Sequence, residues 1–329
     1  MHKNARQVLL DWAEGSYLAP EKLSEAMRLG RVLPAAGDWQ RFVDRMLLAV
    51  GTLLAVSGVI FFFAYNWDDL GRFSRFALVQ GLIVATLGAV WYLGLEKLSG
   101  KIALLAAAVL MGVLCALVGQ TYQTGADTYE LFAVWCILIL PWALLAKFDL
   151  LWLLCLLLLN IATILYYQTF GGFFSLVFGV EQMLWLLFII NTIALVLWEW
   201  LVYRGTSSRR SIRWMTRFLA TVSGGLMTAL AIFAVLGHEL LGVLPGLIGW
   251  FLWMLLAYHW YRKVVLDVYV LAIGVLSAVA VINVAMSRLL FDELEVFGVG
   301  SFTLMSLSVI GISAMGAVWL KHVVVQEQT

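Results

Sequence analysis

The sequence predicts an all-α membrane protein with about ten transmembrane helices, and three observations support this prediction. Apolar residues make up 63% of the 329 residues and charged residues only 12%, whereas about a quarter of a soluble domain is charged. The apolar residues gather into ten stretches, each long enough to cross about 30 Å of hydrocarbon. The Lys and Arg residues between the stretches fall almost entirely into alternate gaps, as expected when basic residues stay on one side of a membrane.

The ten spans follow one another with short polar links between them. Their expected ranges are 46–65, 76–94, 102–119, 130–146, 149–167, 183–203, 217–237, 240–261, 264–285 and 299–320. If the chain begins in the cytoplasm, the cytoplasmic segments hold 18 Lys and Arg residues and the outer segments hold 3. Because basic residues are retained on the cytoplasmic side, the sequence predicts that both termini are cytoplasmic.

Residues 1–45 are expected to form a cytoplasmic helical segment, separate from a transmembrane bundle at 46–329. Val8 and Trp12 share one helical face, and Pro20 is placed where a second helix can begin. Two interpretations are open for this segment. It can be a docking platform for a cytoplasmic partner, or a short helical pair that rests on the membrane surface or on the inner loops.

The transmembrane bundle also shows an internal similarity. The stretch from Arg45 aligns with the stretch from Arg217, and MGVLCALV at 111–118 resembles IGVLSAVA at 273–280. Both copies would begin in the cytoplasm, so the repeats would be parallel and related by an axis along the membrane normal. The alternative is that helices rich in Gly, Ala and Leu resemble one another by composition. The similarity predicts a first repeat, an inserted helix pair and a second repeat at 46–146, 147–204 and 217–322.

The sequence predicts no catalytic residue, no metal ligand and no cofactor. The four His and three Cys residues are scattered singly, without the spacing of a zinc or redox site. No charged residue lies at the middle of an expected span, which disfavours a proton-driven pump. The net charge of +1 leaves no basic face for nucleic acid, so the expected partners are membrane lipids and an envelope protein.

Two polar motifs at the outer ends of the first and third spans form the candidate binding site. Both spans run outward, so the motifs reach the same depth. There, amides and carboxylates can bind hydroxyl groups or cations, and aromatic rings can stack on sugar or lipid head groups. The alternative is interfacial anchoring by the aromatic rings and interhelical amide bonds worth about 0.6 to 2 kcal/mol each. The candidate residues are Asn66, Trp67, Asp68, Gln120, Tyr122 and Asp127, and the secondary candidates are the amides Gln80, Asn160 and Asn283.

The same motifs resemble a known family of bacterial membrane proteins. The similarity lies in an aromatic-rich first span ending in Asn66-Trp67, in Gly119-Gln120-x-Tyr122-Gln123 with Gly125 and Asp127 nearby, and in Trp135 and Pro141-Trp142. Over about residues 1–146 the chain resembles the domain of unknown function 2157 family. The resemblance implies a protein of the bacterial inner membrane and assigns no activity to it.

Three classes of function fit these observations. The predicted one is a non-catalytic membrane component whose outer polar and aromatic face binds an envelope partner or lipid. The second is a transporter or flippase for an amphipathic or lipid-linked solute, and the third is a membrane-embedded transferase. A transferase needs an acid and a base at one site, and the one adjacent candidate pair, His238 and Glu239, does not share a helix face.

Overall fold

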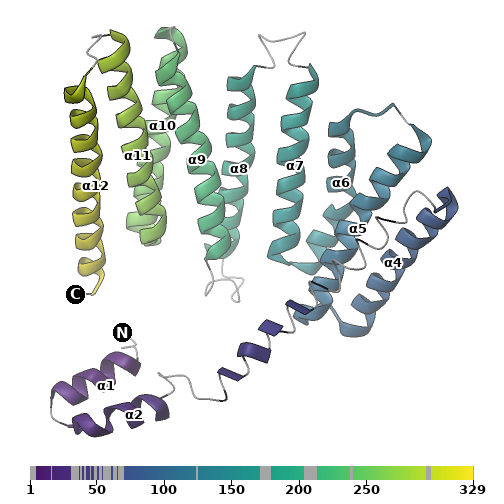
Figure 1. The fold of residues 1–329 in the computed structure, drawn as a ribbon, viewed down its shortest axis with the longest axis horizontal. Coiled ribbons are helices and arrows are strands. Elements are labelled where there is room, and N and C mark those ends of the chain that lie inside the picture. The colour runs from purple at the N-terminus through teal and green to yellow at the C-terminus, as the bar shows by residue number, and fades with distance from the viewer. Residues whose placement is uncertain are drawn as a thin grey trace. The chain divides into compact units, whose positions relative to one another are not determined.

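The computed structural model of the chain is helical throughout the residues that it describes (Figure 1). The described residues are 5–15, 17–30, 70–123, 125–170, 179–203, 213–237, 240–293 and 298–328, with isolated residues and runs of two or three between 37 and 65. The chain divides into two compact units, Met1–Arg75 and Phe76–Thr329. The predicted all-α membrane class is therefore confirmed.

The first unit contains two short helices that pack on each other, α1 (Ala5–Glu14) and α2 (Leu23–Leu29). A 3-10 turn at Pro20–Lys22 leads into α2, which fits the fixed φ of proline at a helix start. The span expected at 46–65 lies outside the described residues apart from isolated residues and runs of two. The division of the chain at residue 45 and the internal repeat therefore stay predictions.

Long helices follow from Arg72 onward, and each overlaps one of the spans predicted from the sequence. Eight of those in the described part of the chain are long and apolar enough to cross a membrane, and α10 is a further helix of 20 residues. The helices are α4 (Arg72–Leu93), α5 (Leu98–Tyr122), α6 (Thr128–Ala146), α7 (Asp149–Phe170), α8 (Val180–Tyr203), α9 (Trp214–Leu236), α10 (Leu240–His259), α11 (Val268–Arg288) and α12 (Val299–Gln328).

In the second unit, successive helices run in opposite directions (Figure 1). We call the end where α5, α7, α9 and α11 finish the upper end, and the end where α6, α8, α10 and α12 finish the lower end. The central helix is α9, which packs on α8, α10 and α11. Of the 18-residue apolar stretch of α9, 50% is buried inside the protein. None of the corresponding stretch of α12 is buried, so α12 lies at the edge.

Apolar clusters of described residues hold the second unit together, and two of them lie on either side of the contact between α7 and α8. One joins α5, α6 and α7, and it includes Leu104, Ile139 and Leu151. The other joins α8, α9, α11 and α12, and it includes Leu219 and Val270. The contact between α7 and α8 is less extensive than the contact of either helix with its other neighbour, so this seam divides the two clusters.

Two helix boundaries differ from the sequence prediction for physical reasons. The helix expected from residue 264 begins at Val268, because the Asp267 side chain accepts a hydrogen bond from the Tyr269 backbone N–H at 3.1 Å and caps the helix there. The helix expected to end at 320 continues to Gln328, and Val323 in this extension is buried in the second cluster.

Candidate functional site

A pocket of about 660 Å³ lies at the upper end between α5 and α6, and we call it the α5–α6 pocket. Its floor is formed by side chains such as Cys115, Val118 and Val134, which lie deeper along the two helices. A polar rim above an apolar floor is suited to an amphipathic molecule. The rim is formed by Gln120, Gln123, Asp127, Thr128 and Glu130.

The rim is shaped by a tight turn that links the two helices. Gln123 follows the last residue of α5 with a φ of 44°, and Gly125 has a φ of 67°. Both values lie in the left-handed region, which glycine adopts without steric cost. Gly119 lies inside α5, and the space beside its Cα is open. Gly125 therefore permits the tight turn, whereas Gly119, which has no side chain, leaves open space in the wall of the pocket.

The carboxylates of Asp127 and Glu130 are the charged groups of the rim. Asp127 is the residue before α6, yet its side chain makes no capping hydrogen bond. Glu130 is in the first turn of α6, and its Oε1 accepts only a long hydrogen bond of 3.4 Å from the Tyr129 hydroxyl. Within the described ranges neither carboxylate has an ion-pair partner, so both remain available to a ligand.

Aromatic rings gather at the upper ends of α6 and α7. Tyr129 and Tyr166 meet edge to face with ring centroids 5.1 Å apart, and Tyr166 lies 4.8 Å from Phe170. Tyr122 is not part of this cluster or of the pocket lining. Its ring lies 6.0 Å from that of Phe76, and the residue is 66% exposed.

The predicted site residues separate into three groups. Gln120 and Asp127 come together on the rim of the α5–α6 pocket, and Tyr122 lies outside its lining. The other three predicted residues, Asn66, Trp67 and Asp68, lie outside the described residues. Convergence of the two motifs on one cavity therefore stays a prediction.

The secondary candidates lie elsewhere, and two of them bridge helices. Asn191 Nδ2 on α8 donates to Asn160 Oδ1 on α7 at 2.7 Å, across the seam between the two apolar clusters. The Ser308 hydroxyl on α12 donates to the amide oxygen of Asn283 on α11. Gln80 is exposed on α4. The contacts of Asn160 and Asn283 fit interhelical hydrogen bonding, and their role in binding stays a prediction.

A buried charge cluster at the lower end was not predicted from the sequence. Arg213 Nη2 lies 2.6 Å from Glu199 Oε1, and Arg213 Nη1 lies 3.5 Å from Asp267 Oδ2. Arg217 Nε lies 3.2 Å from the same Asp267 oxygen. The sequence contains a signal for this cluster: Glu199 and Asp267 are single acids at the ends of expected spans, and Arg213 and Arg217 lie in a basic link between spans. We call these four residues the lower charge cluster, and it connects α8, α9 and α11.

One basic residue at the upper end also has a structural role. Arg288, the last residue of α11, donates hydrogen bonds from Nη1 to the backbone carbonyls of Val235 and Gly237. These carbonyls lie at the end of α9, where the last turn of a helix lacks intrahelical partners and carries partial negative charge. Arg288 therefore caps α9, which accounts for a cation on the side where the sequence predicts few.

Comparison with known proteins confirms the family resemblance for the first part of the chain. Residues 10–152 match the family model of domain of unknown function 2157, which is described as a predicted membrane protein. This range contains every residue that lines the α5–α6 pocket. No curated protein and no solved structure matches the chain.

Proposed function

We propose that this multi-pass membrane protein is a non-catalytic lipid-binding component, and that the α5–α6 pocket holds the head group of an amine-bearing phospholipid such as phosphatidylethanolamine. The observation that carries the proposal is the position of Asp127 and Glu130. Both carboxylates lie on the rim of a 660 Å³ pocket, above an apolar floor, with no ion-pair partner in the described part of the chain.

The chemistry of the rim matches an ammonium group better than a neutral or anionic one. A primary ammonium carries three N–H donors, and carboxylate and amide oxygens are acceptors for them. The side-chain amides of Gln120 and Gln123 can donate to the phosphate oxygens of the same head group. A choline head group carries a similar charge without N–H donors, so the rim would distinguish it from ethanolamine by hydrogen bonding.

The apolar floor positions the lipid and contributes little to selectivity. Lipid tails are as apolar as Val118, Leu131 and Val134, so moving a tail from the bilayer to the floor yields no hydrophobic gain. The hydrogen bonds that the ethanolamine head group can donate and the choline head group cannot contribute about 0.5 to 1.5 kcal/mol each. Selectivity for the head group would therefore be modest, and two carboxylates would be needed to make it measurable.

We place the upper end on the outer side of a bacterial inner membrane, with the termini in the cytoplasm. The lower end carries Lys97, Lys147, Arg262 and Lys263 at helix boundaries. The described part of the upper end carries Arg72, Arg75 and Arg288, of which Arg288 is used as a helix cap. Because basic residues are retained in the cytoplasm, the pocket would face the outer leaflet.

The proposal is tested by native mass spectrometry of the purified full chain in detergent. Phosphatidylethanolamine and phosphatidylcholine with identical acyl chains are added in equal amounts, and retention of the ethanolamine lipid should exceed that of the choline lipid by about fivefold, equivalent to about 1 kcal/mol. Asp127→Asn with Glu130→Gln should abolish the preference. Glu96→Gln, which removes an exposed carboxylate at the lower end, is the matched control and should keep it.

Equal retention of the two lipids by the wild-type chain would refute the proposal. A preference that survives the double substitution would show that the lipid binds elsewhere. A loss of preference in the Glu96→Gln control would show that the effect reflects net charge and not the α5–α6 pocket.

Transport of an amphipathic solute is the second candidate, because polar pairs occur inside the bundle between the two ends. The Thr192 and Ser223 hydroxyls lie 2.6 Å apart, as do those of Thr228 and Ser277. Each hydroxyl in these pairs already has a partner, which favours interhelical bonding. Movement of a fluorescent ethanolamine lipid between the leaflets of liposomes containing the protein, at a rate lowered by the Asp127→Asn and Glu130→Gln pair, would favour transport over static binding.

A further inference from the structure

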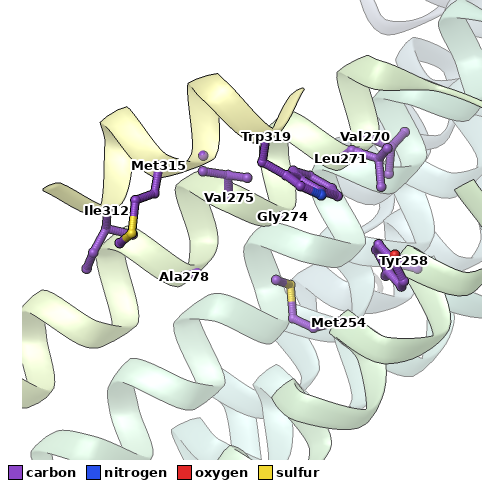
Figure 2. A pocket seen from close by; sticks show the side chains of 12 residues that line it. Met254, Tyr258, Val270, Leu271, Gly274, Val275, Ala278, Ile312, Met315 and Trp319 are labelled. Carbon is purple, nitrogen blue, oxygen red and sulfur yellow. The ribbon is translucent and has the colours of Figure 1, made fainter. Parts of the chain in front are cut away.

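A second cavity of about 320 Å³ lies between α10, α11 and α12, far along the chain from the α5–α6 pocket (Figure 2). We call it the α10–α12 slot. Its walls are apolar and come from all three helices, including Met254 on α10, Val275 on α11 and Ile312 on α12. Figure 2 shows Met315 and Ile312 side by side on α12, with Gly274 and Ala278 on the neighbouring helix.

Two glycines, Gly316 and Gly274, shape the slot in different ways. A Cβ atom on Gly316 would come 2.3 Å from Val275 Cγ1, so the two helices approach too closely for a side chain there. A Cβ on Gly274 would meet only the end of the Met254 side chain, at 3.5 Å. The space in front of Gly274 is therefore cavity, bounded by a flexible thioether, and is suited to an unbranched hydrocarbon chain.

The lower part of the slot leads to a polar contact. The rings of Tyr258 and Trp319, which both line the slot, have centroids 6.1 Å apart. A π-helical turn, Trp260–Val264, continues α10 and contains Arg262 and Lys263. Arg262 follows Tyr258 by four residues and Gln326 follows Trp319 by seven, so each lies on the same helical side nearer the lower end. Arg262 Nη2 donates to Gln326 Oε1 at 2.6 Å. A guanidinium is therefore positioned at the lower mouth of the slot.

The charge around this mouth is positive. Lys263 and Lys321 are exposed at the lower ends of the same helices. Asp267 is the acid nearest in sequence to Arg262 among the described residues, but it is 3% exposed and paired with Arg213 and Arg217. Within the described part of the chain, Asp267 therefore does not neutralise the charge of Arg262 or of the two lysines.

We propose that the α10–α12 slot binds an anionic phospholipid, with an acyl chain in the slot and the phosphate at Arg262. Any bilayer lipid can supply the chain, so the apolar walls alone select nothing. The basic mouth adds the selectivity, since a Lys or Arg near the membrane surface contributes about 1 kcal/mol to the binding of anionic lipid. An arginine also matches the geometry of a phosphate group better than a lysine does.

The test measures lipid retention by the full chain with phosphatidylglycerol and phosphatidylcholine of identical acyl chains. The wild-type chain should retain phosphatidylglycerol preferentially, and Arg262→Gln should lower that retention about fivefold, which is the effect of about 1 kcal/mol. Arg262→Lys keeps the charge and should retain most of the preference. Gln326→Ala removes the hydrogen-bond acceptor of the Arg262 guanidinium. The guanidinium is then free to bind phosphate, so this substitution should not weaken retention of phosphatidylglycerol.

Substitutions inside the slot test the position of the acyl chain. Gly274→Leu places a side chain into the slot and should reduce retention of phosphatidylglycerol. Gly311→Leu is the matched control on α12, because a Cβ there would meet no atom within 4 Å, and it should leave retention unchanged. Thermal unfolding of each variant shows whether the fold is intact.

Three results would overturn the proposal. The first is equal retention of both lipids by the wild-type chain. The second is an unchanged preference in Arg262→Gln. The third is a loss of retention in Gln326→Ala as large as in Arg262→Gln, which would show that the contact between the two residues is structural. None of these results bears on the α5–α6 pocket, where the probe is an amine-bearing lipid.

Discussion

Arg213 Nη2 lies 2.6 Å from Glu199 Oε1, so the residue before α9 is joined by an ion pair to the lower part of α8. The side chains are 16% and 8% exposed, and the same guanidinium also lies 3.5 Å from Asp267 at the start of α11. Three helices that are separate in the sequence are thus connected by one cation. A buried charge that loses its partner is costly, which makes this cluster a sensitive point of the fold.

Substitution of Glu199 by Gln should destabilise the protein by about 3 kcal/mol or more, because Arg213 would keep its buried charge and lose its shortest ion pair. The midpoint of unfolding in a denaturing detergent titration measures the change. Lys263→Gln is the control. Lys263 is exposed, and an exposed charge contributes at most about 1 kcal/mol. Equal losses for the two variants would contradict a special role for the buried pair.

Replacement of Gly112 by Ala should destabilise the first apolar cluster by about 1 to 3 kcal/mol. The added Cβ would lie 2.3 Å from the Trp135 ring, and the ring is held in place by a hydrogen bond of 2.7 Å from Trp135 Nε1 to the Ala108 carbonyl oxygen. Gly88→Ala on α4 is the control, since its Cβ would meet no atom within 4 Å. An unfolding midpoint that is the same in both variants would show that the ring can move aside.

The Asn160–Asn191 pair should show coupling in a double-mutant cycle. Asn191 is 1% exposed, so Asn160→Leu alone leaves a buried amide that has lost its partner across the seam, at a cost of about 0.6 to 2 kcal/mol. Asn160→Leu with Asn191→Leu removes both amides and should cost less than the sum of the single substitutions. Strict additivity of the unfolding free energies would show that the contact does not stabilise the seam between α7 and α8.

The helices of the second unit could be predicted from the sequence because their apolar runs have the length of a bilayer. The site could be predicted only in part. Gln120 and Asp127 are seven residues apart, and a tight turn brings them to one pocket. The lower charge cluster could not be predicted, because Glu199 and Asp267 are far apart in the sequence and their partners lie in a basic link. The positive-inside rule uses Arg213 and Arg217 to orient the chain in the membrane, and it does not predict which residues they contact.

The shape of the α10–α12 slot could not be predicted from the sequence either. Gly274 and Gly316 look alike in the sequence, yet a side chain at Gly316 would strike Val275 and one at Gly274 would enter a cavity. Which glycine closes a helix contact and which opens a space depends on how α11 and α12 meet. Helix periodicity alone does not specify that relation.

The predicted topology can be checked with single cysteines in a background where Cys115, Cys136 and Cys155 are replaced. Thr124→Cys, between α5 and α6, should react with a membrane-impermeant thiol reagent on intact spheroplasts. Ser207→Cys, between α8 and α9, should react only after the membrane is opened. The expectation follows from the 18 to 3 distribution of basic residues in the sequence. Labelling of both positions from the same side would contradict the alternating arrangement of the helices.

The predicted convergence of the two motifs leads to a functional expectation for Asp68 and Gln120. Asp68→Ala with Gln120→Ala should abolish the preference for an ethanolamine lipid and leave the unfolding midpoint nearly unchanged, because Gln120 is exposed. Retention of the lipid together with a lowered midpoint would show that the motifs stabilise the fold and do not bind.

The most direct measurement is a density map of the full chain by cryo-electron microscopy in nanodiscs that contain phosphatidylethanolamine. We expect head-group density in the α5–α6 pocket, with the amine within hydrogen-bond distance of the Asp127 or Glu130 carboxylate, and loss of that density in the Asp127→Asn and Glu130→Gln variant. A pocket that holds only water, or that is filled by the chain's own residues, would contradict it.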